Sequence, residues 1–277
     1  MKKLILKTAL LACVAIAGNA QALPVADQGT WETTLLGRDI NGNAVAGSDA
    51  SAVFFYDKVL DVTWLRDTNA GAGSAYDDIS EGNSGTTTDG RMTWASANTW
   101  AANLTVGSYS GWRLPTMISA PNTTFSFTGG TEFGANVRTT SGGTVYSEMA
   151  SLWYDTLGNK SYCPPSNASC SGDGFPQPGW GLTNTGDFQN LQSWDYWFGL
   201  EYAPDTDYAW KFGTEYGAQG FGYKTANLQV LAVRPGDVLA PIPEPETYAL
   251  MLAGLVVVGA AARRRQSINT GSKKAAP

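Results

Sequence analysis

Apolar residues gather in two long runs, one near each end of the chain, and between them they mix with polar residues. The first run extends from Leu4 to Ala17 behind Lys2 and Lys3, and the second from Tyr248 to Ala262. As a helix rising about 1.5 Å per residue, the second run would be roughly 22 Å long, against a hydrocarbon core of about 30 Å. The pattern predicts a signal peptide at the start and one short transmembrane helix near the end.

Residues 1–22 have the organisation of a secretory signal peptide. Ala20-Gln21-Ala22 places small residues at the −3 and −1 positions of a signal-peptidase site. We therefore expect signal peptidase to cleave between Ala22 and Leu23. A competing interpretation makes Cys13 a lipoprotein site, but the apolar run continues past this cysteine.

The end of the chain combines a short motif, the apolar helix and a basic stop. The motif residues are Pro243, Glu244 and Pro245, and the stop-transfer residues are Arg263, Arg264 and Arg265. Arginines beside a membrane span stay on the cytoplasmic side, which puts everything before the motif across the membrane and makes residues 266–277 a cytoplasmic tail. The two prolines would keep the motif extended and accessible.

This order of motif, helix and arginines resembles the PEP-CTERM sorting signal of Gram-negative bacteria. The resemblance implies recognition by an exosortase, a membrane-embedded transpeptidase-like enzyme. It also implies an inner-membrane intermediate that is then delivered to the cell surface or to an exopolysaccharide, biofilm-type matrix. A plain C-terminal membrane anchor is the alternative interpretation.

Between the two targeting segments, the pattern first becomes regular at Val53. Residues 23–52 are predicted as a polar lead-in, whose one tryptophan, Trp31, could dock on the domain. A β-hairpin then opens an ectodomain over residues 53–237. In its second half Leu60, Val62 and Trp64 alternate with polar residues, which is the period of a half-buried strand.

Two segments have the periodicity of short helices. Thr93 is suited to cap a helix over residues 94–104. Its predicted apolar stripe comprises Trp94, Ala97, Ala101 and Leu104, with Trp100 outside it. Ser147 could cap a second helix, and Gly158 stands where a left-handed C-cap belongs. The stripe of that helix comprises Met149, Leu152, Trp153 and Leu157.

Later segments predict further strands. Aromatic residues crowd together from Trp194 to Phe198, and because neighbours on a strand point to opposite faces, we expect some of them to be exposed. Residues 208–212 alternate, and the apolar run 228–233 indicates a buried strand. Residues 238–247 would be a linker and 248–265 the membrane helix with its stop. The predicted fold class is α+β: a β-rich domain with two short helices, plus one C-terminal transmembrane helix.

Several short segments of the ectodomain are similar to the C-terminal domain of a bacterial collagen-like adhesin, a domain also described as of unknown function. The matching segments are Tyr56-Asp57 with Leu60–Leu65, Met92–Trp94, Gly111–Thr116, Ser147–Asn159, Tyr196-Trp197 with Glu201-Tyr202, and Ala232–Asp237. The resemblance implies a C-type-lectin-like fold, whose members often bind glycans or proteins. Taken by themselves, Arg113 and Arg234 are expected to make structural hydrogen bonds or ion pairs.

Charge and residue counts exclude several classes of function. Residues 23–247 hold ten Lys and Arg against 24 Asp and Glu, a formal charge of −14. Such a surface repels phosphate backbones, so nucleic acid is not an expected partner. The chain has no histidine, which excludes Ser-His-Asp catalysis and His-ligated zinc. The sequence predicts no cofactor and no set of metal ligands. Calcium binding by an acidic loop is the one alternative.

Cysteine usage agrees with export. Only Cys163 and Cys170 remain after signal removal, and an oxidising compartment favours a disulfide between them. Two free thiols are the alternative.

The calcium alternative concerns two acidic loops. One spans residues 67–90, where a solvated loop is the simpler interpretation. The other contains Glu201, Asp205 and Asp207 around a proline, where calcium-dependent sugar binding competes with a plain turn between strands.

Three functions are compatible with the sequence. The first is a noncatalytic ectodomain of a surface-sorted protein that binds polysaccharide or an extracellular matrix component. The second is a carboxylate-based glycan-processing enzyme, for which the sequence selects no catalytic pair. The third is a permanently anchored periplasmic protein.

Overall fold

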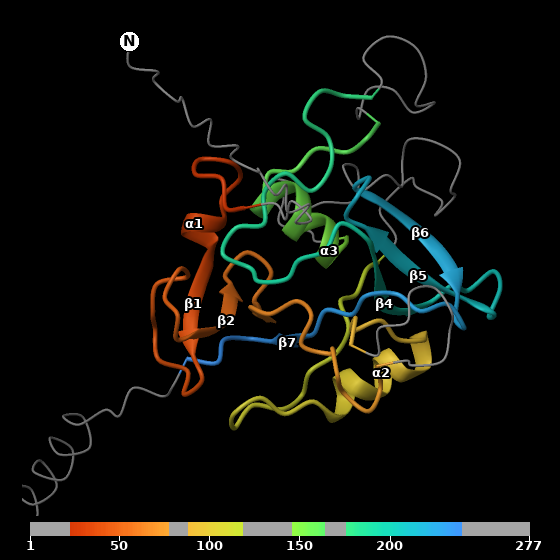
Figure 1. Cartoon of the computed structure of the whole chain (residues 1–277), viewed down its shortest axis with the longest axis horizontal. Helices are drawn as coiled ribbons and strands as arrows, with labels where there is room; N and C mark the ends of the chain where they lie inside the picture. The colour runs from red at the N-terminus through yellow and green to blue at the C-terminus, as the bar shows by residue number, and fades with distance from the viewer. Residues whose placement is uncertain (1–22, 78–87, 119–145, 164–175, 240–277) are drawn as a thin grey trace, which may run out of the picture. The chain divides into compact units, whose positions relative to one another are not determined.

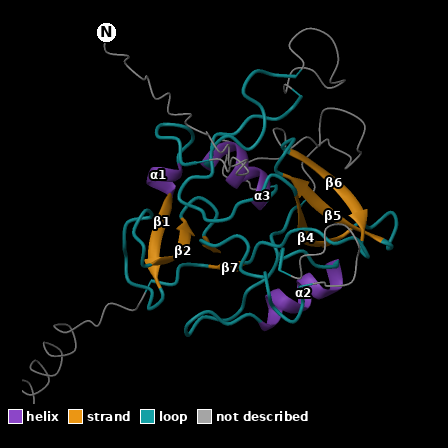
Figure 2. Cartoon of the chain, viewed as in Figure 1, coloured by secondary structure: helices purple, strands orange, loops and turns teal. Residues whose placement is uncertain are grey.

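The computed structural model describes residues 23–77, 88–118, 146–163 and 176–239, and these residues form two antiparallel sheets (Figure 1). One sheet has the strand order β1-β2-β3-β7 and the other the order β4-β5-β6. The helices are few and short, and much of the described chain runs in loops and turns (Figure 2). The β-rich α+β class predicted from the sequence is confirmed.

The elements have the following bounds. The first sheet contains β1 (Leu35–Asp39), β2 (Ala52–Asp57), β3 (Val62–Leu65) and β7 (Val233–Pro235). The second contains β4 (Asp195–Glu201), β5 (Tyr208–Gly213) and β6 (Ala218–Tyr223). The helical elements are α1 (Trp31–Thr34), α2 (Trp94–Asn103), α3 (Glu148–Ala150) and the π-helical turn η2 (Ser151–Thr156).

The segment before residue 53 belongs to the folded domain. Strand β1 pairs with β2 in antiparallel register, with Leu35 opposite Asp57. Trp31 is buried in the core, as its expected docking requires. Asn184, fully buried, accepts a hydrogen bond from the Val25 amide at 2.8 Å and donates one to the Gln28 carbonyl at 3.0 Å. The prediction of a separate polar lead-in over residues 23–52 was therefore wrong, because strand pairing, the hydrogen bonds of Asn184 and the buried Trp31 join this segment to the domain.

The predicted hairpin is confirmed as β2 and β3, but its second strand is not half-buried. All four residues of β3 are buried, and Thr63 donates a hydrogen bond from its hydroxyl to the Gly236 carbonyl at 2.6 Å. The reason is that the first sheet packs on both of its faces. Phe54 and Leu65 belong to one apolar cluster, whereas Phe55 and Trp64 belong to another.

Both predicted helices form, with one difference each. The Thr93 hydroxyl accepts a hydrogen bond from the Ser96 amide at 3.3 Å and caps α2 as expected. Trp100, which the stripe excluded, is buried in the core. Ser147 caps α3 in the predicted manner, and Gly158 has a φ of +68° after the last turn. The helix continues as the π-helical turn η2, which the sequence did not indicate.

The apolar run 228–233 connects the two sheets instead of forming one strand. The Gln229 amide donates to the Asp195 carbonyl at 3.0 Å, at the start of β4, and the Leu65 amide of β3 donates to the Ala232 carbonyl at 3.3 Å. Only Val233–Pro235 is strand β7, although Val230 and Leu231 are 1% exposed. The predicted burial is confirmed, and the predicted single strand is corrected.

The expectation that some of the aromatic residues from Trp194 to Phe198 are exposed is confirmed for one residue, which lies outside strand β4. Tyr196, Trp197 and Phe198 are all fully buried because the two faces of β4 contact different core clusters. The exposed aromatic residue is Trp194, which precedes the strand.

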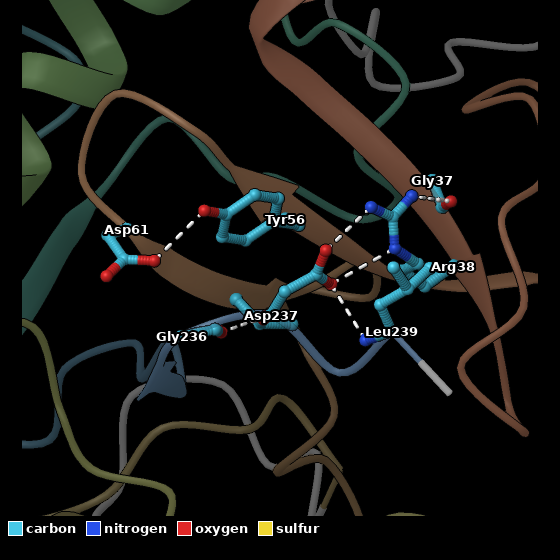
Figure 3. A network of polar contacts seen from close by, with 8 residues as sticks. Gly37, Arg38, Tyr56, Asp61, Gly236, Asp237 and Leu239 are labelled. Atoms are coloured by element: carbon cyan, nitrogen blue, oxygen red, sulfur yellow. Dashed lines mark hydrogen bonds and ion pairs between the residues drawn. The ribbon is translucent and has the colours of Figure 1, made fainter. Parts of the chain in front are cut away.

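A polar network holds the last described residues against the first sheet (Figure 3). Arg38 donates to both carboxylate oxygens of Asp237, from Nε at 3.0 Å and from Nη2 at 2.7 Å. The same carboxylate accepts the Leu239 amide at 3.0 Å. We call the Arg38–Asp237 pair the C-terminal clamp. The adjoining Val238 is 2% exposed, so this residue packs in the folded domain, although it was predicted as the first residue of the linker.

Candidate functional site

A half-open groove lies on one face of the second sheet. Its cavity volume is about 250 Å³. The lining residues are Trp194, Asp195, Lys211, Gly213, Glu215, Tyr216, Ala218, Gln219 and Gly220. They come from the start of β4, from β5 and β6, and from the turn between β5 and β6. We call this feature the β4–β6 groove.

Small residues form the floor of the groove. In the pairing of the three strands, Asp195 lies opposite Gly213, which lies opposite Ala218. The next row on the same face contains Trp197, Lys211 and Gly220. Because side chains alternate between the faces of a strand, the small residues of these rows leave a depression beside larger neighbours.

Trp194 forms one wall of the groove. Its side chain is 44% exposed, and the guanidinium carbon of Arg91 lies 4.7 Å from the centroid of its ring. The Trp194 amide donates to the Thr214 hydroxyl oxygen at 2.9 Å, and the Thr214 amide donates back to the Trp194 carbonyl at 3.0 Å. A half-exposed indole is thus held in place from its backbone and from one ring face.

Tyr216 forms a second wall of the groove and is 45% exposed. Its ring stacks on Trp180, with centroids 5.8 Å apart and an interplanar angle of 7°. Tyr162 contacts the same pair edge-on, 5.4 Å from Tyr216 between ring centroids. The hydrogen bond with the Glu215 carboxylate raises the pKa of the Tyr216 phenol above its usual value. Both walls are therefore aromatic rings braced by other side chains.

The turn that carries Tyr216 depends on a glycine. Gly217 has a φ of +66°, and its amide donates to the Gly213 carbonyl at 2.8 Å. A Cβ at this position would lie 2.4 Å from a ring carbon of Trp153. Tyr154 donates a hydrogen bond from its hydroxyl to the Gly217 carbonyl. The buried helical turn η2 thus fixes the position of the exposed wall.

The lining of the groove carries three charged side chains. The Lys211 ammonium is ion-paired with the Asp195 carboxylate, with side-chain exposures of 25% and 31%. The third is Glu215. The aliphatic part of the Lys211 side chain lies next to the glycines of β6, since a Cβ on Gly222 would lie 3.5 Å from the lysine Cδ.

The acidic loop suggested by the sequence lies elsewhere. Glu201 is the last residue of β4 and pairs with Lys224. The Asp205 carboxylate accepts the Asp207 amide at 3.1 Å within the β4–β5 turn. No group of three potential metal-ligating side chains occurs in the described residues. The loop thus has the geometry of a turn between strands, and the structure does not assemble Glu201, Asp205 and Asp207 into a calcium site.

The other acidic loop is closed by Asp77. Its carboxylate accepts the Gly73 amide at 2.7 Å and the Gly90 amide at 3.1 Å, and only 6% of the residue is exposed. This aspartate therefore joins the two ends of the loop, whereas a solvated side chain was expected.

Arg113 and Arg234 make structural hydrogen bonds, as the sequence predicted. Arg113 donates from both terminal nitrogens to the Glu148 carboxylate, at 2.8 and 2.7 Å. Arg234 donates from Nε to the Ser110 carbonyl at 3.2 Å.

Several predicted site residues lie outside the described ranges. These are the signal-peptide residue Ala22, the motif Pro243–Pro245, the membrane helix 248–265 with Arg263–Arg265, and Cys170. Cys163 is disulfide-bonded and 6% exposed, and its pairing with Cys170 stays a prediction. Within the described residues, none of the helices has the length and apolarity needed to cross a membrane.

Sequence reasoning missed the β4–β6 groove. Trp194, Tyr216 and Trp180 are separated along the chain, and each is unremarkable in its own segment. A usable signal was the concentration of glycines over residues 213–222, which lie between aromatic positions. Glycine-rich strands leave space on a sheet face, but only the strand register shows which aromatic residues border that space.

Comparison with known families identifies the end of the chain. The model of the PEP-CTERM protein-sorting motif matches residues 241–265. This match confirms the predicted sorting signal, and the matched range contains the Pro-Glu-Pro residues and the three arginines, whose individual roles stay predictions. It supports an exported protein that is processed by an exosortase through a membrane-anchored intermediate. No curated protein and no solved structure matches the chain, so the resemblance of residues 53–237 to an adhesin domain gains no support.

Proposed function

We propose that residues 23–239 form a noncatalytic, adhesin-like ectodomain that binds polysaccharide through the β4–β6 groove. The exported chain would present this groove at the cell surface or in an exopolysaccharide matrix after exosortase processing. The premise is the sorting motif over residues 241–265. The binding activity rests on the groove itself.

The observation that carries the proposal is the pair of braced, half-exposed rings, Trp194 and Tyr216, in the lining of a groove with a glycine floor. A sugar ring presents apolar C–H faces and polar hydroxyl edges. Aromatic faces suit the former, whereas the carboxylates and the ammonium of the groove can bond to the latter. Because Arg91 and Trp180 already hold the two aromatic rings, binding would cost little ordering entropy.

The size of the groove favours one unit of a longer polymer. At about 250 Å³ it is smaller than the roughly 300–1,000 Å³ of pockets that enclose a drug-sized ligand. An open site of this size would contact one sugar ring and leave the polysaccharide free to extend from the groove in both directions. That geometry suits attachment to a matrix polysaccharide.

The groove gives less support to the enzyme alternative. Asp195 is committed to the ion pair with Lys211, and Glu215 is hydrogen-bonded to the Tyr216 phenol. A glycosidase would instead need one carboxyl group held protonated and a second placed at a defined separation from it.

The test is polysaccharide binding by the mature chain from Leu23, purified in a detergent without a sugar headgroup. A panel of soluble glucans, galactans, mannans and polymers of amino sugars would be screened by affinity electrophoresis. Trp194→Ala and Tyr216→Ala should each weaken binding by about tenfold, which corresponds to about 1.4 kcal/mol.

The matched control is Tyr223→Ala. Tyr223 is 59% exposed on β6 of the same sheet, but it is not part of the groove lining. Its removal should leave binding unchanged. Equal losses for Tyr223→Ala and Trp194→Ala, or no binding to any polymer by the unaltered chain, would refute the assignment of this groove.

A further inference from the structure

The charged side chains of the groove indicate which sugars it accepts. Among the described lining residues, Lys211 is the one with a positively charged side chain. Its ammonium forms an ion pair with the Asp195 carboxylate. Glu215 adds a second carboxylate. The lining therefore has more negative than positive charge, and its one ammonium is already neutralised by a neighbour within the groove.

A second cation, outside the lining but in contact with Trp194, also has a carboxylate partner. The guanidinium of Arg91 lies over the Trp194 ring, and its Nε is 3.6 Å from the Asp89 carboxylate. A carboxylate or sulfate on a sugar would therefore have to compete with Asp195 for Lys211 and with Asp89 for Arg91. At longer range, the formal charge of −14 over residues 23–247 repels a polyanion.

We infer that the groove selects uncharged or amino-bearing sugar units and rejects uronate units, with Asp195 as the residue that sets this preference. Asp195 acts through its ion pair with Lys211. Without this pair, the Lys211 ammonium could bind the carboxylate of an anionic sugar. The inference rests on the proposed function, since it names the ligand class of the same groove.

Asp195 is well placed for this role. It belongs to the row that contains Gly213 and Ala218, so no large side chain separates its carboxylate from the floor. A Cβ added to Gly213 would lie 2.9 Å from the Asp195 Oδ1 atom. Lys211 lies in the adjacent row on the same face, opposite Gly220. The pair thus spans the floor where a sugar ring would sit.

The decisive variant is Asp195→Asn, which keeps the shape of the side chain and removes its charge. Binding of the mature chain to a neutral glucan, to an amino-sugar polymer and to a polyuronate would be compared at low salt. The unaltered protein should bind the first two and not the third. The variant should gain polyuronate binding by about tenfold or more, because the Lys211 ammonium becomes available for a charge-assisted hydrogen bond.

The matched control is Asp205→Asn. This substitution changes the net charge of the protein by the same amount in the exposed β4–β5 turn, outside the groove. It should leave polyuronate binding unchanged. The double variant Asp195→Asn with Lys211→Met should lose the gained binding, which would assign the gain to the lysine and not to altered folding.

Polyuronate bound by the unaltered protein as tightly as neutral glucan would overturn the inference and leave the proposed function standing. An equal gain for Asp205→Asn and Asp195→Asn would also overturn it, since net charge alone would then explain the effect. Absence of binding to every polymer would instead refute the proposed function, and the inference would fall with it.

Discussion

The two sheets of this domain use their faces differently. In the β1-β2-β3-β7 sheet, strand β3 is buried along its whole length, and the flanking residues Phe54 and Phe55 enter different core clusters. In the β4-β5-β6 sheet, one face is covered only in part. Trp197 and Ala209 of that face are fully buried, whereas Asp195 and Lys211 are partly exposed around a glycine floor.

The difference follows from side-chain size along the strands. Large apolar residues on both faces of β2 and β3 fill the space on either side, so no room is left for a ligand. Gly213, Ala218 and Gly220 leave space on one face of the other sheet. The first sheet is therefore a framework, whereas the second combines a framework face with a surface available for binding.

The ion pairs differ in the same way. In the C-terminal clamp the side chains are 7% and 22% exposed, whereas in the Lys224–Glu201 pair they are 23% and 44% exposed. Breaking a buried ion pair lowers stability strongly, because the charge that remains is left desolvated. Breaking a solvated pair changes stability little. Each of the following predictions tests this contrast between framework and surface.

The largest effect is expected for Trp64→Ala in the first sheet. Trp64 is fully buried, and its indole N–H donates to the Asp57 carboxylate at 3.3 Å. Loss of the ring should lower the free energy of unfolding by about 4 kcal/mol, as for other buried tryptophans. Trp194→Ala should lower it by less than about 1 kcal/mol, since that ring is 44% exposed. Urea unfolding followed by circular dichroism compares the two, and similar losses would contradict the contrast.

Breaking the clamp should have the next largest effect. Arg38→Ala leaves the Asp237 carboxylate without its guanidinium partner and should cost about 3 kcal/mol. Lys224→Ala removes the corresponding cation from the solvated pair and should cost no more than about 1 kcal/mol. Thermal unfolding in one buffer measures both. A smaller loss for Arg38→Ala than for Lys224→Ala would contradict the assignment of the clamp to the framework.

Gly217→Ala tests the connection between the buried turn η2 and the groove. The positive φ of Gly217 and the 2.4 Å approach to Trp153 should together cost about 2 kcal/mol. Gly111→Ala is the matched control, since Gly111 has a φ of +79° and no neighbour within 4 Å of its added Cβ, so it should cost only about 1 kcal/mol. Glycan binding should weaken for Gly217→Ala alone, because Tyr216 would move. Unchanged binding would show that the turn does not position this ring.

The smallest effect concerns pH and Asp57 in the first sheet. Burial raises the pKa of this carboxyl, although the Val59 and Leu60 amides and the Trp64 indole donate to it. A folded-state pKa above the unfolded value of about 3.9 means that the folded protein binds the proton more tightly. The resulting stability is complete below the unfolded value and is lost as the pH rises through the folded value.

The measurement is the free energy of unfolding from pH 4 to 7 for the unaltered chain and for Asp57→Asn. The difference between the two curves isolates this carboxyl from the other titrating groups. Relative to the variant, the unaltered protein should lose stability over this window. A gain in stability over the same window would show that the hydrogen bonds outweigh the burial.

Much of the framework was accessible from the sequence. The β2–β3 hairpin, the Thr93 and Ser147 caps and the C-cap at Gly158 were predicted because each depends on residues close together in the chain. The errors concern contacts between distant segments. Thr63 looked exposed by periodicity and Trp100 lay outside its predicted apolar stripe, yet both are buried, since tertiary packing covers a second face of their elements.

The groove was not predictable in the same way. Its walls come from residues before β4 and after β5, and their bracing partners Arg91 and Trp180 lie far away in the sequence. No periodicity connects these positions. The loop at Glu201–Asp207 was a candidate calcium site because its carboxylates lie close together in the sequence. Proximity in the sequence does not by itself direct side chains toward one bound ion.

The sequence alone determined that the protein is exported and sorted, since a sorting signal is read as a linear order of residues, and the match over residues 241–265 confirms that signal. It also determined the chemistry that is absent, because a chain without histidine cannot use that side chain. Only the tertiary structure decided that residues 23–52 supply a strand and that two aromatic rings border a glycine floor. Strand register and burial depend on pairing between segments far apart in the chain, and the hydrophobic pattern of one segment does not specify its partner.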